Sequence, residues 1–193
     1  MYLAKIKQIL TNPNKFFSSL KEKTLQDALL YFIILSAFSA FMTYIMMLLF
    51  GDSFTRMIVN FFNLNTPIPD FNSVTLLGQT ILGYIFTIAA SFVVAGILYL
   101  WLLLFGGNKG YNKTYQLYTY SQTPTLLFKW IPIVGMFASI YSFILLVIGT
   151  RNTYNFSTLK STLIYLIPLF FLFVIALILA LGTLAFLNFN SLA

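Results

Sequence analysis

The sequence predicts an all-α fold: a polytopic membrane helix bundle with five transmembrane helices plus short amphipathic interfacial helices. Composition is the first reason, because 60% of the 193 residues are hydrophobic and only 8% are charged. A soluble domain is about 25% charged, so this chain has too few polar side chains to cover a water-facing surface. The mean hydropathy of +0.89 agrees. The last reason is a series of charge-free runs of roughly 20 residues, the length at which a helix crosses a bilayer.

These runs place the five predicted spans. The clearest run, at 28–50, contains no charge and would measure about 34 Å as a helix. The second run, at 74–105, is longer than one bilayer thickness, so we expect it to tilt. The third run is the weakest, because it is short and contains several polar side chains. The five spans are predicted at residues 28–50, 74–105, 114–128, 131–149 and 162–187.

Residues 1–27 form a separate cytoplasmic amphipathic segment ahead of the transmembrane domain at 28–193. This segment has no apolar core of the kind found in a cleavable signal peptide. Its apolar side chains instead recur at helical spacing beside lysines, which is typical of a helix lying in the headgroup plane. They are Leu3, Ile6, Ile9, Leu10, Phe16, Phe17 and Leu20. A flexible basic tail is the alternative.

A second stretch of this kind follows the first span. It consists of Phe54, Met57, Ile58, Phe61 and Phe62, and it precedes a proline-containing break. We expect a short interfacial helix here, separate from the span before it.

Basic residues predict how the chain is oriented, because lysine and arginine concentrate in cytoplasmic loops. With five spans and the N-terminus inside, nine of the eleven basic residues are cytoplasmic and only Arg56 and Lys129 are outside. If 114–128 dips into the membrane and returns, the division is eight against three. We therefore expect a cytoplasmic N-terminus and, with five spans, an external C-terminus. The net charge of +7 indicates attraction to anionic lipid headgroups rather than to nucleic acid.

Residue types that the chain lacks argue against several classes of function. There is no cysteine and no histidine, and the four carboxylates are Glu22, Asp27, Asp52 and Asp70. We therefore expect no metal, no cofactor and no catalytic site. The spans hold no ionisable side chain except tyrosine, whereas pumps and proton-coupled transporters carry buried charges.

Small residues recur every four positions in the second span, at Gly83, Thr87, Ser91 and Ala95. In lipid this spacing allows a neighbouring helix to approach closely, so we interpret them as a helix-packing stripe. The first span could supply the opposing face through Ser36, Ala40 and Thr43. A substrate path along this stripe is the alternative interpretation.

The most polar part of the transmembrane domain is the third predicted span and the turn before it. Gly106 and Gly107 permit a tight turn. Pro124 frees a backbone carbonyl near Tyr120, and another group must donate a hydrogen bond to it. Either the segment is a short buried helix bonded to its neighbours, or it lines a polar groove where a partner or lipid headgroup binds. The candidate residues are Gly106, Gly107, Gln116, Tyr120, Ser121, Gln122 and Pro124.

The stretch LLLFGGNKGYNKTYQLYTYSQTPTLLFKWIPIVG resembles the signature region of the Yip (Ypt-interacting protein) domain family. The matching positions are Gly106, Gly107, Gly110, Tyr111, Thr114, Tyr120, Ser121, Pro124, Pro132 and Gly135. The opening NPNKFFSSLKEK is similar to the start of prokaryotic members. The resemblance implies five helices, a cytosolic N-terminus, and a C-terminus outside the cell or in a lumen. A prokaryotic plasma membrane is the expected location, or an endoplasmic reticulum or Golgi membrane in a eukaryote.

Eukaryotic members of that family are associated with Rab/Ypt GTPases, vesicle traffic and membrane shape. The resemblance thus implies GTPase binding, although a basic segment stands here in place of their longer acidic and proline-rich one. Our leading hypothesis is a non-enzymatic protein that organises membrane or protein partners, and a homo-oligomer is one form that it could take. The alternative is a transporter, channel or lipid-translocating protein that uses the polar third span.

Overall fold

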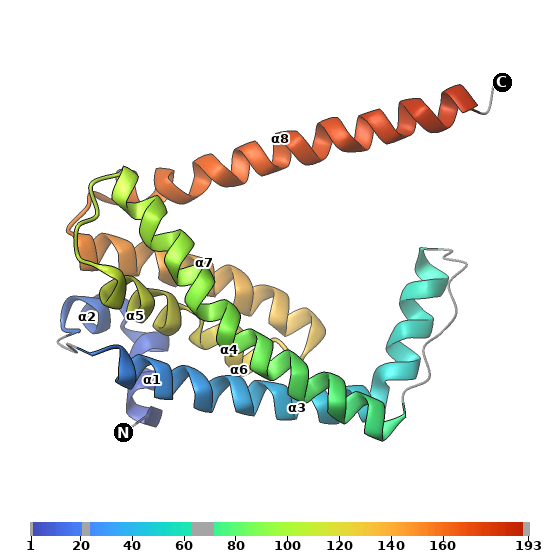
Figure 1. The fold of residues 1–193 in the computed structure, drawn as a ribbon, viewed down its shortest axis with the longest axis horizontal. Coiled ribbons are helices and arrows are strands. Elements are labelled where there is room, and N and C mark those ends of the chain that lie inside the picture. Colours follow the sequence, from blue (N-terminus) through green and yellow to red (C-terminus); the bar gives the residue numbers. More distant parts are fainter. Residues whose placement is uncertain (1, 21–23, 63–71, 191–193) are drawn as a thin grey trace.

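The computed structural model describes residues 2–20, 24–62 and 72–190, and within these ranges the chain forms eight helices and no strand (Figure 1). The all-α prediction is confirmed for this part of the chain. The helices are α1 (Tyr2–Thr11), α2 (Pro13–Ser18), α3 (Leu25–Phe61), α4 (Ser73–Leu104), α5 (Tyr111–Ser121), α6 (Thr123–Phe128), α7 (Pro132–Tyr154) and α8 (Thr158–Asn190).

Four of the described helices are long and apolar enough to cross a membrane: α3, α4, α7 and α8. The predicted span at 114–128 is instead divided between two short helices, α5 and α6, which meet at Gln122. Pro124 lies in the first turn of α6 and has no N–H to donate to the carbonyl of Tyr120. The Thr123 hydroxyl donates to that carbonyl instead, at 2.7 Å. The helical hydrogen bonds are interrupted at this point, and the segment therefore forms two helices, α5 and α6.

Helix α3 is longer than predicted. The span at 28–50 and the apolar stretch that follows it belong to one helix of 37 residues, so the prediction of a separate interfacial helix at 54–62 was wrong. No proline interrupts residues 28–61, so each backbone N–H can continue the helical ladder. Figure 1 shows that the last turns of α3 bend away from its long first part.

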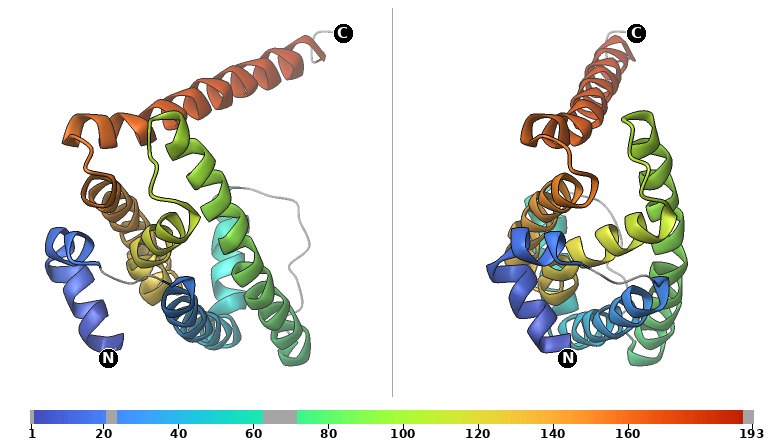
Figure 2. Two further views of the ribbon diagram at one scale, coloured as in Figure 1. Left: turned by 60° about the vertical axis from the view of Figure 1, so that its left-hand side comes forward. Right: turned by 90° about the vertical axis from the view of Figure 1, so that its left-hand side faces the viewer.

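Helix α5 lies at the centre of the bundle. It packs against α3, α4 and α7, while α6 continues between α3 and α7. The helix α8 contacts α7 near its start, where the indole nitrogen of Trp101 on α4 also donates to the carbonyl of Ile164 at 3.0 Å. The large side chains from Leu169 to Phe173 are exposed, and both Figure 1 and Figure 2 show the later part of α8 standing away from the bundle.

The N-terminal helices α1 and α2 pack against the bundle, at the end where α3 begins (Figures 1 and 2). Ile9, Phe16 and Phe17 are buried, and the hydroxyl of Tyr141 on α7 donates to the carbonyl of Leu10 at 2.8 Å. A flexible tail does not fit these contacts. The apolar face that we expected to enter the headgroup layer is largely covered by protein, whereas Leu3 is 81% exposed.

Candidate functional site

The interior of the bundle is built around polar side chains of α5 and α6. Thr114, Gln116, Thr119, Ser121 and Thr123 are all completely buried. Such groups are costly in a membrane-embedded core unless they find hydrogen-bond partners, so their partners explain how the site is held together.

Gln116 and its neighbour Lys113 tie the central helix α5 to the residues between α2 and α3. Its amide nitrogen donates to the carbonyl of Thr24 at 2.8 Å, and its amide oxygen accepts from the Lys113 ammonium at 3.0 Å. The same ammonium donates to the carbonyl of Leu20 at 3.3 Å. Gln116 therefore fixes the position of the N-terminal segment relative to α5, and the lysine beside it is held at the same junction.

Tyrosine hydroxyls provide a second set of links between helices. Each of four buried tyrosines pairs its hydroxyl with that of a serine or threonine on another helix. The pairs are Tyr31 with Thr123 (2.9 Å), Tyr115 with Ser91 (3.1 Å), Tyr154 with Thr114 (2.6 Å) and Tyr165 with Thr150 (2.6 Å). They join α3 to α6, α4 to α5, α5 to α7 and α7 to α8.

The role of these four tyrosines was missed from the sequence. The only tyrosine among the candidate site residues was Tyr120, which is not one of the four. A signal was available, because a tyrosine inside an otherwise apolar span must satisfy its hydroxyl within the protein. Helical periodicity, however, does not identify which serine or threonine is the hydrogen-bond partner.

The glycine turn after α4 has specific backbone requirements. Gly106 and Gly110 have φ values of 82° and 83°, a region that residues with a Cβ rarely adopt. Gly107 is buried, and a Cβ there would lie 2.9 Å from the carbonyl oxygen of Leu102 and 3.0 Å from the ring of Tyr154. The turn thus allows Tyr154 to reach Thr114, which places the glycines beside the polar interior and not in a ligand-binding loop.

The structure brings most of the predicted groove residues together inside the bundle. Gln116, Tyr120, Ser121 and Pro124 are buried, Gln122 is half-buried and Gly106 is exposed. The ring of Tyr120 packs edge-on against Phe16 and Tyr31, at centroid distances of 5.1 Å each. Side chains fill this region, which favours a short buried helix over an open groove.

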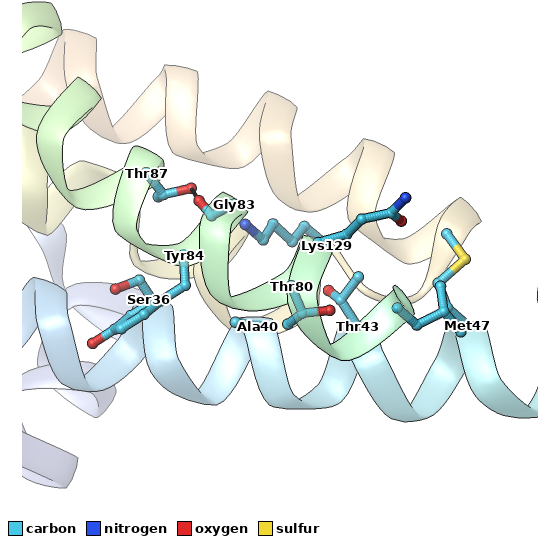
Figure 3. Close-up of a pocket in the computed structure, with 11 residues that line it drawn as sticks. Ser36, Ala40, Thr43, Met47, Thr80, Gly83, Tyr84, Thr87 and Lys129 are labelled. Atoms are coloured by element: carbon cyan, nitrogen blue, oxygen red, sulfur yellow. Dashed lines mark hydrogen bonds between the residues drawn. The ribbon is translucent and has the colours of Figure 1, made fainter. Parts of the chain in front are cut away.

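The small-residue stripe on α4 divides into two parts. Ser91 and Ala95 are buried in the core, as helix packing requires. Gly83 and Thr87 instead face a cavity of about 350 Å³ between α3 and α4. Figure 3 shows that the side chain of Lys129, from the end of α6, reaches into the same space. Sequence reasoning assigned no role to Lys129.

The lengths and compositions of the long helices define a class of protein. Four described helices have the length and composition of membrane spans, and among the described residues no group of histidine, cysteine and carboxylate side chains could hold a metal ion. The chain is an integral membrane protein whose described residues form helices and no strand.

The Yip1 domain family matches residues 7–181, and the chain belongs to that family. The resemblance seen in the glycine turn and the α5–α6 segment is thereby confirmed, and the match also includes most of the N-terminal segment. The comparisons with curated proteins and with solved structures found no match.

Proposed function

We propose that this chain is a non-enzymatic membrane protein that organises the surrounding bilayer or its protein partners. In this proposal the chain crosses the membrane five times, with α1 and α2 on the cytoplasmic side. One observation carries the proposal: the two N-terminal helices are fixed to the bundle and present lysines outward.

The apolar side chains of α1 and α2 are used to dock these helices. Ile9, Phe16 and Phe17 are buried against the bundle, while Lys7 and Lys15 are exposed. A Phe17 ring carbon would lie 3.0 Å from a Cβ on Gly149 of α7, so this contact is close. Docked in this way, the helices add width to one end of the bundle and direct positive charge toward anionic headgroups. Width at one leaflet favours membrane curvature.

The filled interior supports an organising role over transport through the third segment. A path along α5 would need space beside Gln116 and Ser121, and both side chains are completely buried. The exposed apolar side chains of α8 provide a surface for lipid or for a second copy of the chain. Examples are Phe170 at 64% and Phe171 at 61% exposure.

Reconstitution into liposomes tests the proposal. The protein should bind more strongly to vesicles that contain anionic lipid and should reduce their diameter or form tubules from them. Lys7→Gln combined with Lys15→Gln should weaken vesicle binding roughly thirtyfold, because about 1 kcal/mol of attraction is lost for each lysine near an anionic surface.

Arg56→Gln is the control, because Arg56 lies on the far part of α3 and is exposed. Vesicles that keep their size with the wild-type protein, or that respond equally to the double variant, would argue against the proposal. Selective solute flux through the wild-type protein would favour the transport alternative.

A further inference from the structure

Lys129 lies in the turn between α6 and α7, and its side chain occupies the cavity between α3 and α4 (Figure 3). Hydroxyl and amide groups from both helices share this space with the ammonium group. They are Ser36 and Thr43 on α3 and Gln79, Thr80 and Thr87 on α4. These polar groups occupy one part of the cavity wall, which is otherwise apolar, and we name it the polar cavity after them.

The charge of Lys129 is not neutralised within the described part of the chain. Neither of the described carboxylates, Asp27 and Asp52, lines the cavity, and the lysine makes no ion pair or hydrogen bond with any described residue. Gln79 and Thr80 are likewise without hydrogen-bond partners there. Lys129, Gln79 and Thr80 therefore supply one cationic and two neutral donors along the wall of this cavity, and such donors match the oxygen atoms of an anion.

A second cavity adjoins the first and has a different character. It measures about 160 Å³, and it shares Thr43, Met47 and Lys129 with the polar cavity. Its remaining walls are apolar or aromatic: Met46, Phe50, Phe54, Trp130 and Pro132. A ligand that fills both spaces has an anionic group beside Lys129 and a hydrocarbon part beside the phenylalanines. This combination describes an amphiphile and not a free ion.

We propose that this pair of cavities binds an anionic phospholipid, with its phosphate group at Lys129 and part of an acyl chain in the apolar cavity. A single ammonium balances a lipid of charge −1, whereas a zwitterionic lipid brings its own cation. Gly83 and Ala40 leave room for the headgroup, and a Cβ on Gly83 would meet no atom within 4 Å. The first half of the small-residue stripe therefore makes space for a ligand. This site does not depend on the organising function proposed above.

Native mass spectrometry of the purified full chain tests the site. After detergent extraction, the protein is titrated with phosphatidylglycerol or with phosphatidylcholine, and the bound lipid is counted. The wild-type protein should retain one phosphatidylglycerol more tightly than any phosphatidylcholine. Lys129→Gln should weaken retention of that lipid roughly tenfold, the effect of about 1.4 kcal/mol, and Lys129→Arg should restore it. The matched control Lys109→Gln removes the same charge from another turn and should leave retention unchanged.

Two further arms separate the ligand chemistry from the fold. Gly83→Leu fills the polar cavity without removing a charge and should also weaken retention, while the unfolding temperature in detergent stays near that of the wild type. Inorganic phosphate at millimolar concentration should not displace the lipid. The proposal is overturned if Lys129→Gln retains phosphatidylglycerol as the wild type does. It is also overturned if inorganic phosphate displaces the lipid, because a free anion would then be the ligand.

Discussion

At the scale of single residues, the interior of this bundle depends on buried polar side chains that form hydrogen bonds with more than one partner. Gln116 is completely buried, and it joins the carbonyl of Thr24 to the ammonium of Lys113. The Gln122 side chain, one and a half turns later, is only half-buried and has no hydrogen-bond partner in the described ranges. Replacing Gln116 would therefore remove two hydrogen bonds, whereas replacing Gln122 would remove none that the structure describes.

We therefore expect Gln116→Leu to destabilise the protein far more than Gln122→Leu. The first substitution removes the bonds that the completely buried Gln116 amide makes to the Thr24 carbonyl and to Lys113, at a cost of about 1 to 3 kcal/mol, whereas the second removes no bond described here. Thermal unfolding in detergent micelles measures the difference. Equal unfolding temperatures for the two variants would show that the Gln116 bonds contribute nothing to stability.

At the scale of helices, α7 has a glycine where three elements meet. A Cβ on Gly149 would clash with a methyl group of Leu117 on α5, and it would lie 3.0 Å from the ring of Phe17 on α2. Leu117 is completely buried and Phe17 is 3% exposed, so neither side chain has free space into which to move. The close contact of α2, α5 and α7 therefore requires the absence of a side chain at this position.

Gly149→Ala should consequently destabilise the protein, by about 1 to 3 kcal/mol of overpacking. The expected loss is opposed by alanine's better helix propensity, which alone would stabilise by about 1 kcal/mol. Gly182→Ala on α8 is the matched control, because a Cβ there meets nothing within 4 Å, and it should leave the protein as stable or more so. Chemical unfolding of the two variants in the same detergent compares them. A more stable Gly149→Ala protein would contradict the packing seen here.

The same elements show what could be predicted from the sequence and what could not. Charge-free runs located α3, α4, α7 and α8, because lipid requires apolar side chains over a whole span. They did not show that α3 continues past Gly51, since neither charge nor glycine by itself ends a helix. The burial of Ile9 and Phe16 was also not predictable, because an apolar face is equally suited to lipid and to protein.

At the scale of the whole molecule, contacts between distant segments indicate how the chain crosses the membrane. Tyr154, at the end of α7, lies against Gly107 in the turn that follows α4, and its hydroxyl bonds Thr114 at the start of α5. The end of α4 and the end of α7 therefore lie at the same end of the bundle. If α7 crosses the membrane once, it begins on the opposite side from the place where α4 ends.

The two short helices α5 and α6 must then carry the chain across. Their contacts follow α4 backward, from Tyr111, which donates to the carbonyl of Phe92 at 3.0 Å, to Lys129 in the cavity beside Gly83. The 18 residues at 111–128 would extend about 27 Å as continuous helix, which is close to the hydrocarbon thickness of about 30 Å. Five crossings would therefore let the weakest predicted span, at 114–128, cross the membrane as two short helices.

Single cysteines test this topology directly, because the chain contains none of its own. Cysteines are placed one at a time at Ser73, Asn108, Trp130 and Ser157, and sealed vesicles are treated with a thiol reagent that cannot cross the membrane. With five crossings, Asn108→Cys and Ser157→Cys should be labelled from one side, and Ser73→Cys and Trp130→Cys from the other. If α5 and α6 only dip into the bilayer and return, Trp130→Cys would share the side of Asn108→Cys and Ser157→Cys would lie opposite. That result would contradict five crossings, because the contact between Tyr154 and the glycine turn places the end of α7 at the same end of the bundle as Asn108.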